Sequence, residues 1–124
     1  MSQDAWDVQA TEPELELVPV RLLGTGASAP TRQYGRDITV ARTGVGVYTL
    51  TFRETPGTFV GGQVALQGAT PGNLKNVSVV FNTWNATTRV LEITVWSGAG
   101  AARELAATEL LLLVLFFQPR AAGI

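Results

Sequence analysis

The chain has 124 residues, of which 46% are hydrophobic and 15% are charged, and it contains neither cysteine nor histidine. These absences exclude disulfide bonds, zinc sites with cysteine or histidine ligands, cysteine nucleophiles and Ser-His-Asp triads. A chain of this length forms one domain, and charge well below the usual quarter of residues favours extensive contacts between subunits. The formal net charge is -1, but five of the ten acidic residues precede the first basic residue, Arg21.

This uneven charge predicts an extended acidic arm over residues 1–13, followed by a β-sandwich domain over residues 14–124. The arm ends at Pro13 and carries one large aromatic residue, Trp6. A tryptophan in a polar terminal segment commonly serves as an anchor, so we expect Trp6 to contact a neighbouring subunit or a larger shell. The alternatives are that the segment folds back onto its own domain or is a solvated terminus.

The first strand is predicted within Glu14–Leu23, where apolar and polar residues alternate. Pro19 cannot donate a ladder hydrogen bond, which favours an edge strand or an interruption. The next segment, Gly24–Gly35, is rich in small and polar residues and predicts a surface loop. Its opening GTGASA fits the dinucleotide fingerprint G-x-G-x-x-A, but the polar loop after Pro30 provides no helix to hold a pyrophosphate, so we reject that site.

A β-hairpin is predicted from Asp37–Arg42 and Val47–Arg53, which flank a turn containing Gly44 and Gly46. Further along, the pair Gly61-Gly62 predicts a bulge within the strand Thr58–Gln67. Two more strands follow, with alternating apolar residues at 77–81 and 91–95, joined by a polar connection at 82–88. Residues 97–108 break the strand rhythm and allow at most a short helix.

The last predicted strand, Leu110–Phe117, is apolar at all eight positions (LLLLVLFF). Such a strand is expected to be shielded from water on both faces, so either a second layer of the same chain or another subunit covers each face. It is too short to cross a bilayer. We expect Leu111, Leu113, Leu115 and Phe117 to face either the core or a subunit or capsid interface, with the alternate set in the other role.

About seven short strands separated by glycine and proline indicate an all-β fold, either an antiparallel β-sandwich or a jelly-roll-like barrel. Catalysis is not indicated, because no spacing pairs the carboxylates of the predicted domain into an acid-base site. The arginines are scattered without a basic stripe, and no basic amphipathic helix is present, so we predict no nucleic-acid or membrane partner. We also predict no metal and no cofactor, which leaves a binding or structural module.

The segment Asp37–Phe52 (DITVARTGVGVYTLTF) resembles the T/R-x-G-x-G-x-Y-x-L-x-F hairpins of tailed-bacteriophage virion proteins. The ending Glu109–Gln118 (ELLLLVLFFQ) looks like the final strand of small phage β-sandwich proteins, which include capsid decoration (cement) proteins and tail-fibre heads, many of them trimeric. The resemblance carries over no catalytic residue. The chain has no heptads or collagen-like repeats for a fibre shaft, which favours a decoration protein.

The resemblance therefore implies a non-enzymatic structural protein that decorates and stabilises a phage capsid as a homotrimer. Its partner would be the major capsid protein, and its location the capsid surface of a virion assembled in the host bacterial cytoplasm. The alternative is a receptor-binding head of a tail fibre or spike that recognises host glycan or protein through loops 24–35 and 82–88. A small carbohydrate-active enzyme is a third option.

Overall fold

A computed structural model describes residues 15–35, 37–54, 56–68, 74 and 76–118, and these form eight strands and no helix. The strands are β1 (Glu16–Leu23), β2 (Thr31–Tyr34), β3 (Ile38–Gly44), β4 (Val47–Phe52), β5 (Thr58–Gln67), β6 (Ser78–Asn85), β7 (Val90–Trp96) and β8 (Leu110–Gln118). The predicted arm, residues 1–13, lies outside the described residues.

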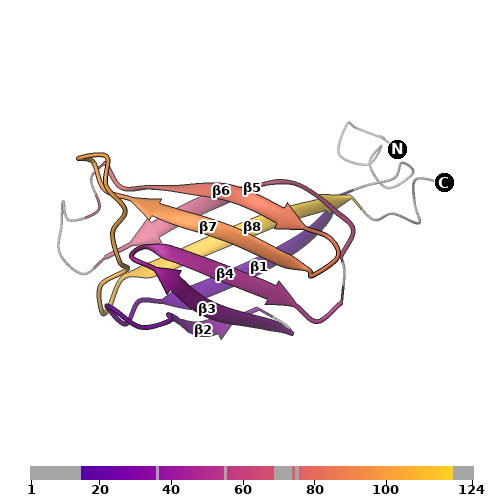
Figure 1. Ribbon diagram of the computed structural model, residues 1–124, viewed down its shortest axis with the longest axis horizontal. Helices are drawn as coiled ribbons and strands as arrows, with labels where there is room; N and C mark the ends of the chain where they lie inside the picture. Colours follow the sequence, from indigo (N-terminus) through magenta and orange to yellow (C-terminus); the bar gives the residue numbers. More distant parts are fainter. Residues whose placement is uncertain (1–14, 36, 55, 69–73, 75, 119–124) are drawn as a thin grey trace, which may run out of the picture.

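The strands form two four-stranded antiparallel sheets, with the orders β2-β1-β8-β5 and β3-β4-β7-β6. Figure 1 shows them as two stacked layers, with the β3-β4-β7-β6 sheet nearer to the viewer. The prediction of an all-β antiparallel sandwich is confirmed. Of the two architectures that the sequence left open, the structure has the sandwich of two separate sheets.

The core lies between the two sheets and is built from alternate residues of each strand, because successive side chains of a strand point to opposite faces. The fully buried side chains of the first sheet come from β1 and β8, and those of the second from β4 and β7. They include Val20, Leu22, Leu111, Leu113, Leu115 and Phe117 on one side, and Tyr48, Leu50, Leu91, Ile93 and Val95 on the other.

The predicted hairpin and bulge are both present. β3 and β4 pair in antiparallel register around a turn in which Gly46 has a φ of 68°. This left-handed conformation is one that glycine adopts readily, which explains the glycine at the turn. In β5 the register against β8 shifts between Phe59 and Gly61, at the predicted glycine pair.

Two local predictions are wrong, and a third holds only in part. The predicted loop 24–35 contains β2. The four residues of this strand (TRQY) are all exposed, and their sequence lacks the apolar alternation that marks a strand. The predicted connection 82–88 is partly strand, since β6 continues to Asn85. The edge position expected at Pro19 is found only locally, since β1 as a whole lies between β2 and β8. β2 pairs only with Arg21–Leu23, so at Pro19 the strand has a described neighbour only in β8.

The segment that links β7 to β8, residues 97–109, crosses from one sheet to the other and contains no helix. It buries Leu105 completely in the core. Backbone hydrogen bonds from Gly26 to the Leu105 carbonyl (2.9 Å) and from Gly24 to the Glu109 carbonyl (2.8 Å) attach it to the chain after β1. The crossing segment is therefore an ordered part of the sandwich rather than a loose loop.

Candidate interaction surface

The two faces of β8 have different surroundings. Leu111, Leu113, Leu115 and Phe117 are each 0% exposed and face the second sheet. The alternate residues lie on the outer face of the first sheet and are partly exposed; they are Leu110, Leu112, Val114 and Phe116. The structure thus assigns one face of the apolar strand to the core of this chain and leaves the other without a covering layer among the described residues.

The neighbouring strands extend this apolar outer face on both sides of β8. Leu17 pairs with Phe116 and is 58% exposed, Pro19 pairs with Val114, and Leu23 pairs with Leu110. On the other side, Ala65 pairs with Leu112 and Val60 at the bulge is 55% exposed. Two exposed glutamines, Gln63 beside Val114 and Gln67 beside Leu110, make this margin partly polar. We call the outward-facing side of β1, β8 and β5 the apolar face.

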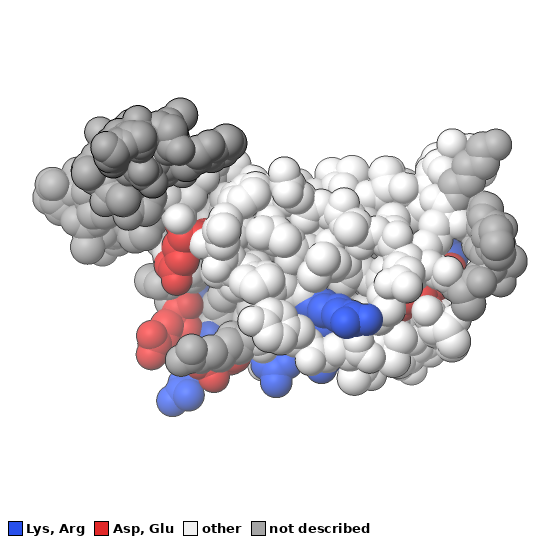
Figure 2. Space-filling view, turned by 180° about the vertical axis from the view of Figure 1, so that it is seen from behind, with Lys and Arg blue, Asp and Glu red and all other residues white. Residues whose placement is uncertain are grey.

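The apolar face carries very little charge. Arg21, Leu112 and Ala65 lie side by side on β1, β8 and β5, and we call this line of paired residues the central row of the face. Arg21 is the only charged residue among the described outward positions of these three strands. Its side chain is exposed and has no ion pair or hydrogen bond with another described residue. Figure 2, which shows the molecule from behind, displays this side as a wide white surface with charge gathered mainly at one end and along the lower rim.

The outer face of the second sheet has a different chemistry. Its outward positions are more mixed, since Thr39, Thr43, Thr49 and Thr51 stand among Val47, Val80 and Val90. The charged residue of its central row is Glu92, which pairs with Thr49 and accepts a hydrogen bond from Asn82 (3.1 Å). Hydroxyl and carboxylate groups form hydrogen bonds with water and aliphatic groups do not, so this face is better suited to solvent than the apolar face.

The structure brings together four of the five residues predicted for a subunit or capsid interface, but it places them in the core of the monomer. Leu111, Leu113, Leu115 and Phe117 have no exposed surface to offer a partner. Trp6, the fifth residue, lies outside the described residues. The surface available for contact belongs to the alternate set, which is the second arrangement that the sequence allowed. It also includes neighbours on β1 and β5, which the sequence did not single out.

The phenylalanine at the end of β8 organises an aromatic cluster inside the sandwich. The Phe117 ring meets those of Phe52, Phe59 and Trp84 edge-to-face, with centroid separations of 5.4, 5.4 and 5.2 Å. Such contacts add to the stabilisation from burial. The side chain of Trp84 is partly buried and packs against the core.

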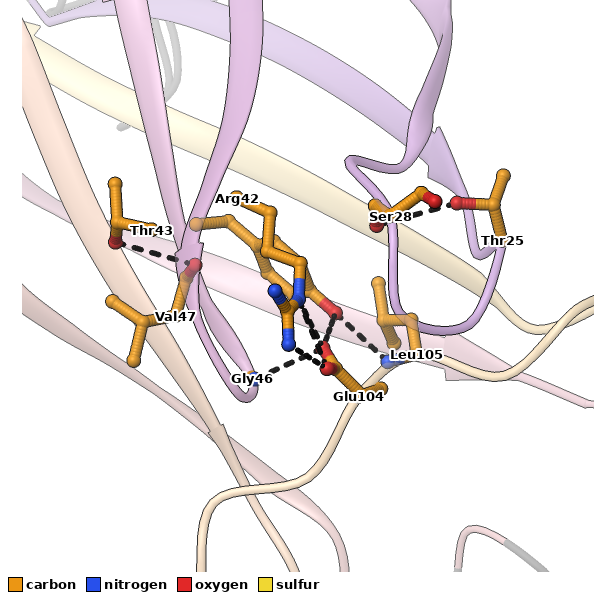
Figure 3. Close-up of polar contacts among 9 residues, drawn as sticks. Thr25, Ser28, Arg42, Thr43, Gly46, Val47, Glu104 and Leu105 are labelled. Atoms are coloured by element: carbon orange, nitrogen blue, oxygen red, sulfur yellow. Dashed lines mark hydrogen bonds and ion pairs between the residues drawn. The ribbon is translucent and has the colours of Figure 1, made fainter.

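A polar network at the opposite end joins the β3–β4 hairpin to the crossing segment (Figure 3). Arg42 donates hydrogen bonds to both carboxylate oxygens of Glu104, and the backbone amide of Gly46 donates to the same side chain (3.1 Å). Hydrogen bonding to Arg42 lowers the pKa of Glu104, although partial burial opposes this shift. Tyr48 donates to Glu104 (3.3 Å) and accepts from the Leu105 amide (2.9 Å), and burial raises its pKa.

Two other carboxylates, those of Glu109 and Asp37, are also paired with arginines. Glu109 is buried and accepts hydrogen bonds from Arg103 (2.9 Å) and from the Ala106 amide (2.8 Å). Asp37 forms a long ion pair of 3.8 Å with exposed Arg53. Within the described ranges, no three residues among Asp, Glu, His and Cys gather as a metal site would require. Glu104, Glu109 and Asp37 therefore act as structural partners of arginines.

An open pocket of about 450 Å³ lies at the end of the sandwich where β3 begins and β4 ends. Its lining includes Arg32, Asp37, Arg53 and Arg89. Two of the arginines are held by backbone carbonyls, since Arg32 donates to Gly35 and Ile38, and Arg89 donates to Phe52. This pocket brings together residues next to the two predicted recognition segments, 24–35 and 82–88.

Comparisons with models of known protein families, with curated protein sequences and with solved structures find no match for this chain. In the part of the chain that the structure describes, there is no helix with the length and apolar character of a membrane span.

Proposed function

We propose that this chain is a non-enzymatic structural subunit of a tailed-phage virion, a capsid decoration protein that acts as a homotrimer. The observation that carries the proposal is the apolar face, because an uncovered strip of leucine, valine and phenylalanine on a sandwich is typical of a surface that another protein covers. The partners are copies of this chain and the major capsid protein, and the site of action is the capsid surface.

The size of the apolar face supports a role in assembly. Nine residues of strand span about 30 Å, and three strands are about 14 Å wide, so the whole face, with Arg21, Gln63 and Gln67 included, covers roughly 400 Å². Apolar patches of about 300 to 600 Å² on a monomer are often functional, whereas a standard stable interface buries about 800 Å² per partner. The face is therefore large enough to be an interaction site but needs additional contacts to hold a complex alone.

Decoration would stabilise a shell by adding buried area where capsid subunits meet. Apolar burial contributes about 25 cal/mol per Å², which makes each contact modest. Three linked subunits engage the shell together, and the second and third contacts form at high effective concentration. A trimer thus binds more tightly than any one of its contacts, and it resists the internal pressure of packaged DNA by holding neighbouring capsid subunits together.

The test compares two exposed aliphatic residues on opposite faces. Leu112 is 39% exposed on the apolar face, and Val80 is 44% exposed on the outer face of the second sheet. We expect Leu112→Asn to shift the protein from trimer to monomer in sedimentation at micromolar concentration and to reduce its copy number on purified heads. Val80→Asn should change neither quantity. A monomeric wild-type protein, or equal effects of the two substitutions, would contradict the proposal.

A receptor-binding head of a tail fibre is the second candidate, and the arginine-lined pocket favours it. Arginine and aspartate side chains in an open depression suit the hydroxyl and carboxylate groups of an acidic sugar. Binding of the isolated protein to a glycan array, lost on Arg53→Gln, is the result expected for this role. Co-purification with tails rather than heads would separate it from decoration.

A further inference from the structure

The apolar face combines two features that a partner must satisfy together, a hydrophobic strip and a lone positive charge in its central row. Arg21 stands beside Leu112 with no ion pair among the described residues. We propose that residues 1–14 of a neighbouring copy lie across the apolar face, with a carboxylate of that segment paired with Arg21. This inference rests on the self-assembly in the proposed function and names the contact that supplies it.

The composition of residues 1–14 matches the face. The segment contains four acidic residues and no basic one, and Trp6 and Val8 lie between the acids. The acids are Asp4, Asp7, Glu12 and Glu14. An aromatic and an aliphatic side chain pack well against leucine and valine, while the acids supply a negative charge to pair with the Arg21 guanidinium.

Charge also selects one face of the sandwich over the other. The central row of the apolar face contains Arg21, whereas the equivalent row of the second sheet contains Glu92. An acidic segment is attracted to the first and repelled by the second. Two apolar faces packed directly on each other would instead bury two Arg21 side chains without an acid on the described surface, which makes that arrangement costly.

The length and the sequence of the segment favour a neighbouring copy over the same chain. Fourteen extended residues span about 46 Å, which exceeds the roughly 30 Å length of the face. Folding back onto its own face requires the chain to reverse direction before β1, whereas reaching a neighbouring copy requires no reversal. The residue before Pro13 also favours an extended backbone. We therefore expect the segment to continue away from β1 and reach another subunit.

Because the chain contains no cysteine, disulfide trapping tests this contact cleanly. One protein carries Ala5→Cys, and a second carries Ala65→Cys on the apolar face or Ala41→Cys on the other face. Ala65 and Ala41 form a matched pair, since both are exposed, outward-facing and located in a central row. Mixed proteins are oxidised and resolved on a non-reducing gel, and sedimentation of the unmodified protein is measured in parallel.

We expect the Ala5→Cys protein to cross-link with the Ala65→Cys protein at least fivefold faster than with the Ala41→Cys protein. Adding Arg21→Gln should slow the favoured reaction two- to fivefold, as should 0.5 M salt, whereas Arg21→Lys should preserve it. Equal rates at the two alanines, or a link that forms only within a chain carrying both cysteines, would overturn the inference. Trimers without the Ala5–Ala65 link would refute this contact alone, and a monomeric protein would refute the proposed self-assembly.

Discussion

Two adjacent phenylalanines of β8 provide a direct test of the division between its faces. Phe117 is fully buried and contacts three aromatic rings, whereas Phe116 lies on the apolar face opposite Leu17. Truncating either to alanine removes the same atoms from the same strand. The two substitutions should nevertheless affect different equilibria, since Phe117 stabilises the folded monomer and Phe116 stabilises its association.

For Phe117→Ala we expect a loss of about 3 to 5 kcal/mol in the free energy of unfolding, the range for phenylalanine truncations in cores. The structure favours the upper part, because three edge-to-face contacts disappear and the rigid strands around the site limit its collapse. With an unfolding entropy of about 2.1 cal/mol/K per residue, a chain of 124 residues loses about 12 to 19 °C in Tm.

Urea unfolding followed by far-UV circular dichroism over a range of protein concentrations measures both effects. The loss caused by Phe117→Ala should be independent of concentration. Phe116→Ala should cost less than about 1.5 kcal/mol in dilute protein, and its cost should grow with concentration as assembly begins to stabilise the unmodified chain. Equal, concentration-independent losses for the two variants would refute the assignment of one face to the core and the other to association.

The polar network at the crossing segment supports three further predictions. The lowered pKa of Glu104 means that its carboxylate stabilises the fold above about pH 4.3, and that this contribution vanishes as the pH falls through the lowered value. Glu104→Gln should therefore lower the Tm at pH 7 and make the Tm less sensitive to acidification. Tyr48→Phe leaves the buried Leu105 amide without its acceptor and should cost about 1 to 3 kcal/mol in urea unfolding. Gly46→Ala should cost more than Tyr48→Phe in the same assay, because its φ is 68° and a Cβ would collide with the Arg103 backbone. An unchanged acid dependence of Tm in Glu104→Gln, or an unchanged urea midpoint in Tyr48→Phe, would contradict these expectations. So would a smaller loss of stability in Gly46→Ala than in Tyr48→Phe.

Local sequence patterns predicted those parts of the fold that local chemistry determines. The β3–β4 hairpin follows from alternation on both sides of two glycines, and the bulge in β5 follows from Gly61-Gly62. β2 was missed because its stability does not depend on burying an apolar side of its own. It pairs with the end of β1, a contact between segments that alternation cannot reveal.

The sheet order and the polar network depend on contacts between distant residues. Arg42 and Glu104 are separated by 62 positions, and nothing in the spacing of either residue identifies the other as its partner. Glu104 lies in the segment 97–108, for which the sequence allowed a short helix, but this segment is ordered by the ion pair with Arg42 and by burial of Leu105. Such pairings become visible only once the two sheets are in place.

The two faces of β8 could be distinguished only through a neighbouring strand. Every residue from Leu110 to Phe117 is apolar, so the strand itself gives no preference for either direction. β1 does, because Arg21 requires solvent or a counter-ion and therefore lies on the outer face, whereas Val20 and Leu22 lie in the core. The pairing of Arg21 with Leu112 transfers this preference to β8 and assigns its even-numbered residues to the outside. One charged residue thus orients the apolar strand and, on the contact proposed above, also determines what binds to it.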